Sequence, residues 1–396
     1  MEQISNLQLP QAFLEFLESN GLDPSIYSAI DTTPRYIRLK PGSEDGGDYI
    51  KEIEREISCK LEKVNWLPHF YSLPSHVQIA NSRAYKQGKI YGIDAASGAA
   101  VMALNISCGD HVLDLCAAPG AKLCMMAELL GNSGSVTGVD VARHRLAACR
   151  TLLQKYALGD RCRLFVADGT KFSIFPVRDC SNSGSCEFAC QENEDTYKEW
   201  TSRRPYKERK RTSKAREHGA STSVAESDCP ELIFYGRDSG VVGLRKSELD
   251  QIVSSNNTLS CGYDKVLVDA ECTHDGSIRH IQKFENWGWE TLHQRVLQAE
   301  RSDNLTSLQL KLLTNGFKLL RVGGLVVYST CSLTVSQNEE VVQKFLEENP
   351  SAELRDIDAA KNWPCKSGRI HKTLRFDPIT SQTSGLFVAK FTKLAI

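Results

Sequence analysis

The chain has 396 residues, 41% hydrophobic and 24% charged, which excludes a disordered or fibrous protein and allows one large domain beside a small one. A net charge of −1 excludes a globally basic nucleic-acid binder, so a nucleic-acid surface would have to be a local patch. The fourteen cysteines are scattered singly, which favours free thiols over a disulfide framework.

The beginning of the chain shows neither a signal-peptide nor a transit-peptide pattern, and acidic residues appear early. No apolar run approaches the length of about 18 residues that a membrane span needs. We therefore expect a protein of the nucleus or cytoplasm that makes no membrane contact.

Residues 1–83 predict a small α+β module. Apolar residues recur at helical spacing near the start, and residues 35–39 alternate as a half-buried strand does. The expected elements are a helix at 9–20, a strand at 35–39, a helix at 50–62 and short strands near 64–67 and 77–80.

Residues 84–396 predict a second domain in which strands and helices alternate. Such alternation is typical of a parallel sheet with helices on both faces, an α/β fold. The pair Gly323-Gly324 is expected to break the chain before one of its strands. Strands are expected at 111–115, 135–139, 163–166, 265–269, 325–328 and 386–391, and helices at 123–130, 145–156, 305–320 and 338–348.

A polar segment interrupts this second domain at about 178–262, and we expect a surface insertion that is partly disordered. Within it, residues 203–216 hold eight Lys or Arg against one Glu. This run is compatible with a solvated charge run, a nucleic-acid arm or a nuclear localisation signal. No metal site is predicted, because no C-x-x-C pair occurs among Cys180, Cys186, Cys190 and Cys229.

The segment from Cys116 to Lys122 has the features of a cofactor loop. It follows a predicted strand and precedes a helix, and its small residues let a ligand approach the helix N-terminus. Asp140 and Asp168 end the next two strands, where acids can bind ribose hydroxyls and an adenine amino group. The single glycine, Gly120, favours S-adenosylmethionine over a dinucleotide. The alternative is that these residues only pack a helix on a strand and cap helices.

Two cysteines follow predicted strands at what should be the same edge of the sheet. Cys272 lies three residues after Asp269, and Cys331 lies in the run Tyr328-Ser329-Thr330-Cys331-Ser332. A thiolate that attacks carbon 6 of cytosine turns carbon 5 into a nucleophile for a methyl group. Asp269 is placed to stabilise such an adduct. The alternative for each cysteine is a buried small apolar residue.

With these motifs the chain resembles the RNA 5-methylcytosine methyltransferases of the Nop/Sun type. The resemblance covers 84–177 and 263–392 and, more loosely, 30–80. Ser329-Thr330-Cys331-Ser332 matches the family's Ser-Thr-Cys-Ser motif, and Asp269-Ala270-Glu271-Cys272 is similar to its Asp-Ala-Pro-Cys motif. The loop from Cys116 to Lys122 is similar to its cofactor loop, with Ala121 in place of the usual Gly.

The resemblance implies a Rossmann-like class I methyltransferase sheet with an RRM-like N-terminal module. It implies that Cys331 is the nucleophile, that Cys272 helps to release the product, and that Lys122 and Asp269 support the site. S-adenosylmethionine would be the cofactor, and the partner of a monomeric enzyme would be tRNA or rRNA. The expected cofactor-binding residues are Cys116, Ala117, Ala118, Pro119, Gly120, Ala121, Lys122, Asp140, Arg145, Asp168 and Asp269.

The chain departs from the family at Glu271, which replaces a proline that would stiffen the loop, and at residues 273–276. These departures leave open a catalytically impaired RNA-binding or assembly factor that retains the fold. A methyltransferase for DNA or a small molecule is a third hypothesis. In an RNA enzyme, Arg35, Arg38 and Lys40 of the N-terminal module are candidate phosphate contacts.

Overall fold

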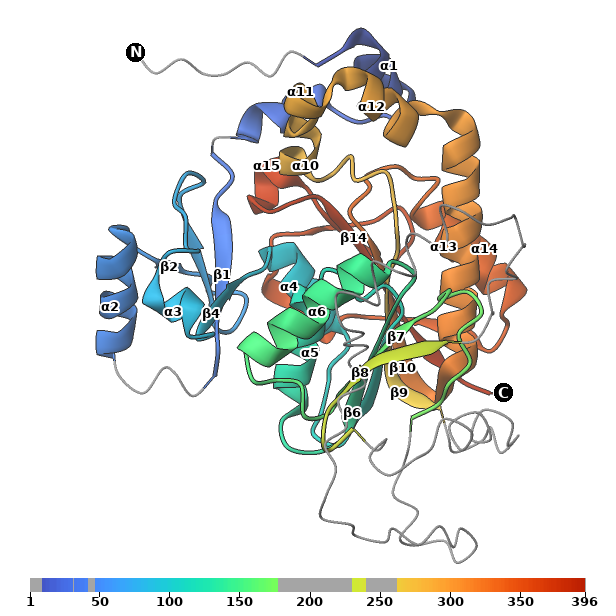
Figure 1. Ribbon diagram of the computed structural model, residues 1–396. Helices are drawn as coiled ribbons and strands as arrows, with labels where there is room; N and C mark the ends of the chain where they lie inside the picture. Colours follow the sequence, from blue (N-terminus) through green and yellow to red (C-terminus); the bar gives the residue numbers. More distant parts are fainter. Residues whose placement is uncertain (1–8, 31, 42–46, 177–229, 240–261, 396) are drawn as a thin grey trace, which may run out of the picture.

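The computed structural model describes residues 9–30, 32–41, 47–176, 230–239 and 262–395. In these ranges the strands form two sheets, one of four strands and one of ten (Figure 1). None of the helices there combines the length and the apolar character that crossing a bilayer requires. Most of the predicted insertion lies outside the described residues, including the basic run 203–216 and the four cysteines considered for zinc.

The four-stranded sheet is antiparallel, with the strand order β2-β3-β1-β4. With its two helices it follows the β-α-β-β-α-β order and confirms the RRM-like module. Its elements are β1 (Arg35–Leu39), α2 (Gly47–Ile57), β2 (Glu62–Lys63), β3 (Phe70–Leu73), α3 (Arg83–Lys86) and β4 (Ile90–Gly92).

The strands expected at 64–67 and 77–80 are wrong. Both segments are closed by local backbone hydrogen bonds, from Leu67 to Val64 and from Val77 to Pro74, so their apolar residues occupy turns around β3. Strand β4 lies beyond residue 83, and the domain division at that residue stays a prediction.

The first helices pack away from the small sheet. Helix α1 (Gln11–Ser19), expected at 9–20, and the 3₁₀ segment η1 (Pro24–Ile30) lie against a helical cap formed by residues 278–297 (Figure 1). This cap consists of α10 (Ile278–Gln282), α11 (Phe284–Trp287), α12 (Trp289–Leu292) and η2 (His293–Leu297).

The ten-stranded sheet has a parallel centre in the order β10-β9-β5-β6-β7, which confirms the predicted α/β fold. These strands are β5 (His111–Asp114), β6 (Ser135–Asp140), β7 (Cys162–Val166), β9 (Tyr263–Asp269) and β10 (Leu320–Thr330). Strand β8 (Glu231–Tyr235) pairs antiparallel with β7, so an apolar run of the expected insertion extends the sheet at this edge.

Antiparallel strands extend the other edge. Strand β14 (Leu386–Lys393) pairs with β10, and the remaining elements of this region follow β10 in the chain. They are β11 (Ala352–Arg355), η3 (Asp358–Asn362), β12 (Lys366–Ser367), β13 (Leu374–Phe376) and α15 (Pro378–Ser381).

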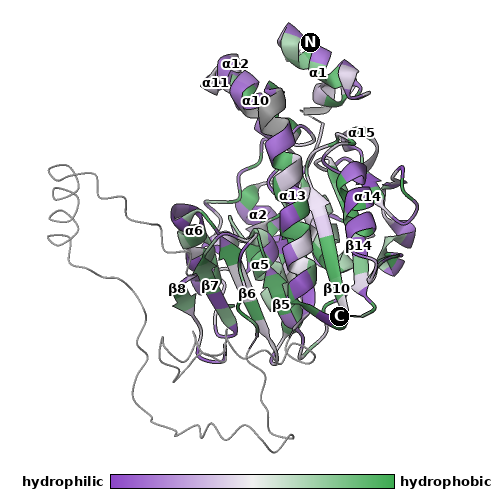
Figure 2. Cartoon of the chain, turned by 90° about the vertical axis from the view of Figure 1, so that its right-hand side faces the viewer, coloured by the Kyte–Doolittle hydropathy of each residue, from purple (hydrophilic) through white to green (hydrophobic). Residues whose placement is uncertain are grey.

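Helices cover both faces of the large sheet and bury two separate apolar clusters (Figures 1 and 2). One face carries α4 (Ala95–Ala103), α5 (Ala121–Leu130) and α6 (Arg143–Lys155). The other carries α13 (Ala299–Leu319) and α14 (Glu339–Glu348). The sheet is coloured mostly green in Figure 2 because strands that are buried on both faces are nearly continuous apolar runs.

Gly323-Gly324 does not separate the helix from the next strand as expected. Strand β10 already begins at Leu320, and its register against β9 shifts between Leu320 and Leu325. Gly323 has a φ of +77°, which only glycine adopts without strain, so the two glycines form a bulge inside the strand.

Candidate active site

Four parallel strands deliver acids and a thiol to one edge of the large sheet. β5 ends at Asp114, β6 at Asp140 and β9 at Asp269, while Cys331 directly follows β10. Ser329 is the partner of Asp269 in the register of β10 and β9. The carboxyl ends of these strands therefore form the crevice in which α/β proteins bind their ligands.

The loop from Cys116 to Lys122 joins β5 to α5 at this crevice. Gly120 has a φ of +107° and caps α5, and a Cβ atom there would lie 2.9 Å from the Cα of Cys149. Glycine is therefore required at this position. Ala117 and Ala118 are buried, Cys116 and Ala121 are half-buried, and Pro119 is exposed.

Asp140 and Arg145 hold this loop from the neighbouring strand and helix. The Asp140 carboxylate accepts hydrogen bonds from the amides of Ala118 (3.1 Å) and Ala142 (2.8 Å). Arg145 donates to the carbonyl of Ala118 at 2.9 Å. Arg145 and Asp140 thus both order the cofactor loop, and Asp140, at the end of β6, also lies at the crevice.

The crevice has a donor set that fits S-adenosylmethionine. Asp168 is exposed after β7 and accepts from Thr170, so acids follow two successive strands. Val141 beside Asp140 is 73% exposed, an apolar surface for a flat purine ring that the sequence analysis missed. The free amides at the start of α5 suit a carboxylate.

Asp114 is a further acid that the sequence analysis passed over. Its side chain is buried and accepts from the amide of Cys116, at the root of the cofactor loop. Burial, and then the nearby charge of Asp269, raise the pKa of Asp114 to about 8. The signal for it was an acid that ends a strand directly before the loop.

Lys122 and Asp269 connect the cofactor loop to the end of β9. Lys122 Nζ lies 2.7 Å from Asp269 Oδ2, and the Ser329 hydroxyl donates to Asp269 Oδ1 at 2.7 Å. Burial by itself would lower the pKa of Lys122, but the charge and hydrogen bond of Asp269 outweigh it and raise that pKa. Lys122 is therefore protonated at neutral pH.

The two cysteines meet at the ends of β9 and β10, and a histidine joins them. The sulfurs of Cys272 and Cys331 are 3.3 Å apart. His274 Nδ1 lies 2.8 Å from the Cys331 sulfur and 3.7 Å from that of Cys272. Residues 273–276 depart from the family's motif, but no sequence motif assigns a role to His274. The signal was an imidazole two residues after Cys272.

The charges in this cluster depend on one another. Burial disfavours a Cys272 thiolate, but hydrogen bonds from Cys331 and the charge of His274 prevail and lower the pKa of Cys272. The hydrogen bond to Cys272, followed by burial, raises the pKa of Cys331. The charge of Cys272 raises the pKa of His274 to about 9. The ionisation of the two thiols is therefore coupled to that of His274.

A buried network fixes the backbone around His274, whose φ is +58°. The neighbouring Asp275 is fully buried and accepts from Thr273 Oγ1 and from the amide of Leu333 at 2.7 Å. The carbonyl of Asp275 accepts from the Tyr27 hydroxyl at 2.7 Å. Segments from three parts of the chain thus hold this turn.

Glu271, which stands where the resembling family has a proline, is exposed. Its carbonyl accepts a hydrogen bond from the Gln309 side chain at 2.8 Å. Helix α13 therefore anchors the loop without the ring of a proline.

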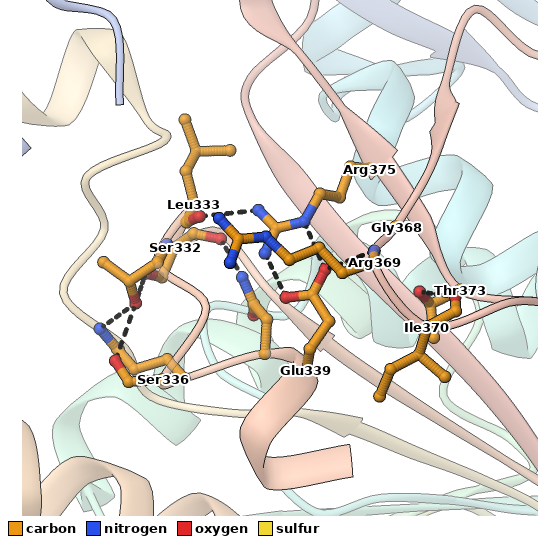
Figure 3. A network of polar contacts seen from close by, with 12 residues as sticks. Ser332, Leu333, Ser336, Glu339, Gly368, Arg369, Ile370, Thr373 and Arg375 are labelled. Carbon is orange, nitrogen blue, oxygen red and sulfur yellow. Dashed lines mark hydrogen bonds and ion pairs between the residues drawn. The ribbon is translucent and has the colours of Figure 1, made fainter. Parts of the chain in front are cut away.

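The turn after Cys331 is held by a second network (Figure 3). Arg375 donates to the carbonyl of Leu333 at 2.7 Å and forms an ion pair with Glu339 at the start of α14. The amide of Arg369 donates to the same carboxylate at 3.1 Å. The position of the Cys331 thiol thus depends on β13 and on the segment before it.

A groove of about 880 Å³ lies between the small sheet and α15. Its walls include Lys60, Lys63 and His76, and at its far side Gln382, three residues before Gly385. The amide of Gly385 donates to the carbonyl of Gly276 at 2.8 Å, so the chain leads from the groove wall to the segment that carries His274 within a few residues.

Three basic residues were expected to contact phosphates, and the prediction for Arg38 is wrong. Its side chain is 1% exposed and is paired with Glu128 of α5, so it joins the small sheet to the large one. Lys40 donates to the carbonyl of Tyr156 at 2.6 Å. Arg35 is exposed.

Comparisons with known proteins agree with this architecture. The model of the family described as 16S rRNA methyltransferase RsmB/F matches residues 101–179 and 241–392. A mouse (Mus musculus) 28S rRNA (cytosine-C(5))-methyltransferase is 26% identical over 385 residues, which cover 92% of this chain and 63% of that protein. A Pyrococcus abyssi tRNA (cytosine(49)-C(5))-methyltransferase is 23% identical over 359 residues, covering 87% and 84%.

The fold has solved counterparts. The structure of NSun6 from Pyrococcus horikoshii with SFG has a TM-score of 0.62 at 15% identity and covers 98% of this chain and 99% of that one. The chain spans less than two thirds of the mouse relative's length. Because the family model matches more than half of the chain and the motifs agree with it, the chain belongs to the 16S rRNA methyltransferase RsmB/F family, which confirms the resemblance to RNA cytosine-C5 methyltransferases.

Proposed function

We propose that this chain methylates carbon 5 of cytosine in RNA and uses Cys331 as its nucleophile. The observation that carries the proposal is the pair of sulfurs, 3.3 Å apart, at the ends of two parallel strands beside the cofactor loop. A fold-retaining binding factor would not need two thiols and an imidazole in this arrangement. The relatives are named for cytosine-C5 methylation of rRNA or tRNA, which supports RNA as the substrate.

S-adenosylmethionine would supply the electrophilic methyl group. Asp140 and Asp168 would bind its ribose and adenine, Val141 would cover the adenine ring, and the start of α5 would face its carboxylate. Asp114, Lys122 and Asp269 lie between this place and Cys331. The cytosine must reach them from a single-stranded region or flipped out of a helix.

Covalent catalysis divides the reaction into two easier steps. The Cys331 thiolate bonds to carbon 6, and the electron pair of the C5–C6 double bond moves into the ring, where the Lys122 ammonium stabilises the negative charge and Asp269 orients the base. Carbon 5 then takes the methyl group. In the second step the carbon 5 proton passes to the Cys272 sulfur. The electron pair of the broken C5–H bond restores the C5–C6 double bond, and Cys331 leaves as a thiolate.

The experiment is tritium release from 5-tritiated cytosine, offered to the full chain in RNA and in matched DNA. Release from RNA that requires S-adenosylmethionine and is lost in Cys331→Ala is the expected result. Release from DNA alone would refute the RNA assignment. Cofactor binding without release from transcripts of tRNA or rRNA would favour the assembly factor.

A further inference from the structure

His274 has the closest polar contact to the Cys331 sulfur among the described residues. Its Nδ1 lies 2.8 Å from that sulfur, closer than the 3.3 Å between the two sulfurs. An imidazole nitrogen at this distance from a thiol forms the pair that activates cysteine nucleophiles. Neither the sequence motifs nor the mechanism above assigns a role to this residue.

The chain accepts backbone strain in order to place this imidazole. A side chain larger than glycine at a φ of +58° costs roughly 1–3 kcal/mol and persists only where surrounding structure enforces it. Here Asp275, Tyr27 and the amide of Gly276, which donates to the Cys331 carbonyl at 2.9 Å, enforce it. Strain that several independent contacts maintain is typical of a functional position.

The groups around His274 favour its charged form. Cys272 and Cys331 contact its ring, Asp269 and Glu271 contribute negative charge, and the His280 ring lies 4.8 Å away between centroids. Lys122, whose charge reaches Cys331, is neutralised by Asp269. An imidazolium in this place is therefore compensated by the acids and by one thiolate.

We propose that His274 is the proton acceptor of the Cys272–Cys331 pair and keeps one thiolate in that pair at neutral pH. The S–H bond breaks with its electron pair left on sulfur, and the proton bonds to the Nδ1 lone pair. The other thiol keeps its proton and shares it across the 3.3 Å gap. This inference rests on the proposed function for its role in methylation, but the ionisation itself can be measured without RNA or cofactor.

The same acceptor closes the proton balance of the proposed reaction. Bonding of Cys331 to carbon 6 removes the negative charge from the cysteine pair. The His274 imidazolium is then no longer stabilised by a neighbouring thiolate and gives its proton to solvent. Neutral Nδ1 can then take the proton of Cys272, and the Cys272 thiolate accepts the carbon 5 proton. Release of Cys331 restores the starting state, with one proton given to solvent per methyl group.

The test is the pH dependence of alkylation at Cys272 and Cys331, measured by iodoacetamide labelling and mass spectrometry of the two peptides. The full chain is used in reduced form with a metal chelator present. His274→Asn is the main variant, since asparagine tolerates the left-handed backbone and cannot accept the proton. His274→Gly provides a second variant without backbone strain. His280→Gln is the matched control, because it removes a second imidazole whose ring packs on that of His274 at 4.8 Å between centroids.

The expected result is rapid alkylation of the pair near pH 7 in the parent chain and in His280→Gln. In both His274 variants the rate near pH 7 should fall about tenfold or more and recover as pH approaches the ordinary thiol pKa of about 8.5. Profiles that coincide in parent and variants, with unchanged urea midpoints, would overturn the assignment. If the His274 variants lose alkylation rate near pH 7 as expected but the parent chain methylates no RNA, the result would count against the proposed function alone.

Discussion

Lys122 Nζ and Asp269 Oδ2 lie 2.7 Å apart and join the cofactor loop to the end of the strand that precedes Cys272. The ion pair is only partly exposed, and Ser329 of β10 donates to the same carboxylate. The ends of β9 and β10 and the first turn of α5 are thereby held in one fixed arrangement. Cofactor position and base position are coupled through these two side chains.

This coupling predicts that Lys122→Met impairs both binding and chemistry. It leaves the Asp269 carboxylate without its cation in a partly buried place, which costs roughly 2–3 kcal/mol. We expect the rate of methyl transfer, measured by tritium release, to fall by about two orders of magnitude. The affinity for the cofactor, measured by calorimetry, should weaken as well. A double-mutant cycle with Asp269→Asn should show strong coupling, and additive effects would contradict the pair.

Asp140→Asn should weaken the binding of S-adenosylmethionine by about 1–3 kcal/mol, because a charged acceptor for the ribose hydroxyls is lost. The amides of Ala118 and Ala142 donate to different oxygens of Asp140, so asparagine keeps only one of these two hydrogen bonds, and part of the effect comes through the loop. Isothermal titration calorimetry measures the effect, with Asp168→Asn as the parallel variant. An unchanged dissociation constant would remove Asp140 from the cofactor site.

Cys272→Ala should accumulate a covalent protein–RNA adduct. Without this sulfur the carbon 5 proton has no acceptor next to Cys331, so release slows more than attack. A denaturing gel should show a slowly migrating band that nuclease removes, and Cys272→Ala with Cys331→Ala should abolish it. If the single variant turns over without any such band, product release uses another group.

Glu339→Gln should destabilise the fold by about 3 kcal/mol at pH 7, because Arg375 keeps its half-buried position but loses its buried counter-ion. Burial opposes ionisation of Glu339, yet the hydrogen bonds and charge of Arg375 lower its pKa below the ordinary value of 4.5. The contribution is therefore full above pH 4.5 and is lost as pH falls through the lowered pKa. Urea unfolding should show that the difference in the free energy of unfolding between the parent and the variant becomes smaller in acid.

RNA affinity should depend on the groove and not on Arg38. Lys63→Ala removes an exposed cation from the groove wall and should weaken binding and reduce the salt dependence by about one counter-ion. Arg38→Met should instead lower the free energy of unfolding, since it leaves the Glu128 carboxylate without its cation between the two sheets. Filter binding at several salt concentrations separates the two effects. Equal salt slopes for the parent and Lys63→Ala would exclude the groove as a phosphate contact.

Much of the large sheet could be predicted because its information is local. Strands buried on both faces are continuous apolar runs, and the helices between them repeat every three to four residues. Strand β3 and the bulge in β10 escaped prediction, because Phe70–Leu73 is short and flanked by turns and because a glycine pair marks a bulge as well as a break.

The sequence by itself determined the chemistry available to this protein: two cysteines and an acid after predicted strands, and a loop of small residues before a helix. Only the tertiary structure decided which groups meet. Strand order and register bring Cys272 and Cys331 together, a strained turn held by Tyr27 and Asp275 aims His274 at their sulfurs, and Arg38 is withdrawn into an internal ion pair. Such contacts join residues far apart in the chain, so no local pattern encodes them.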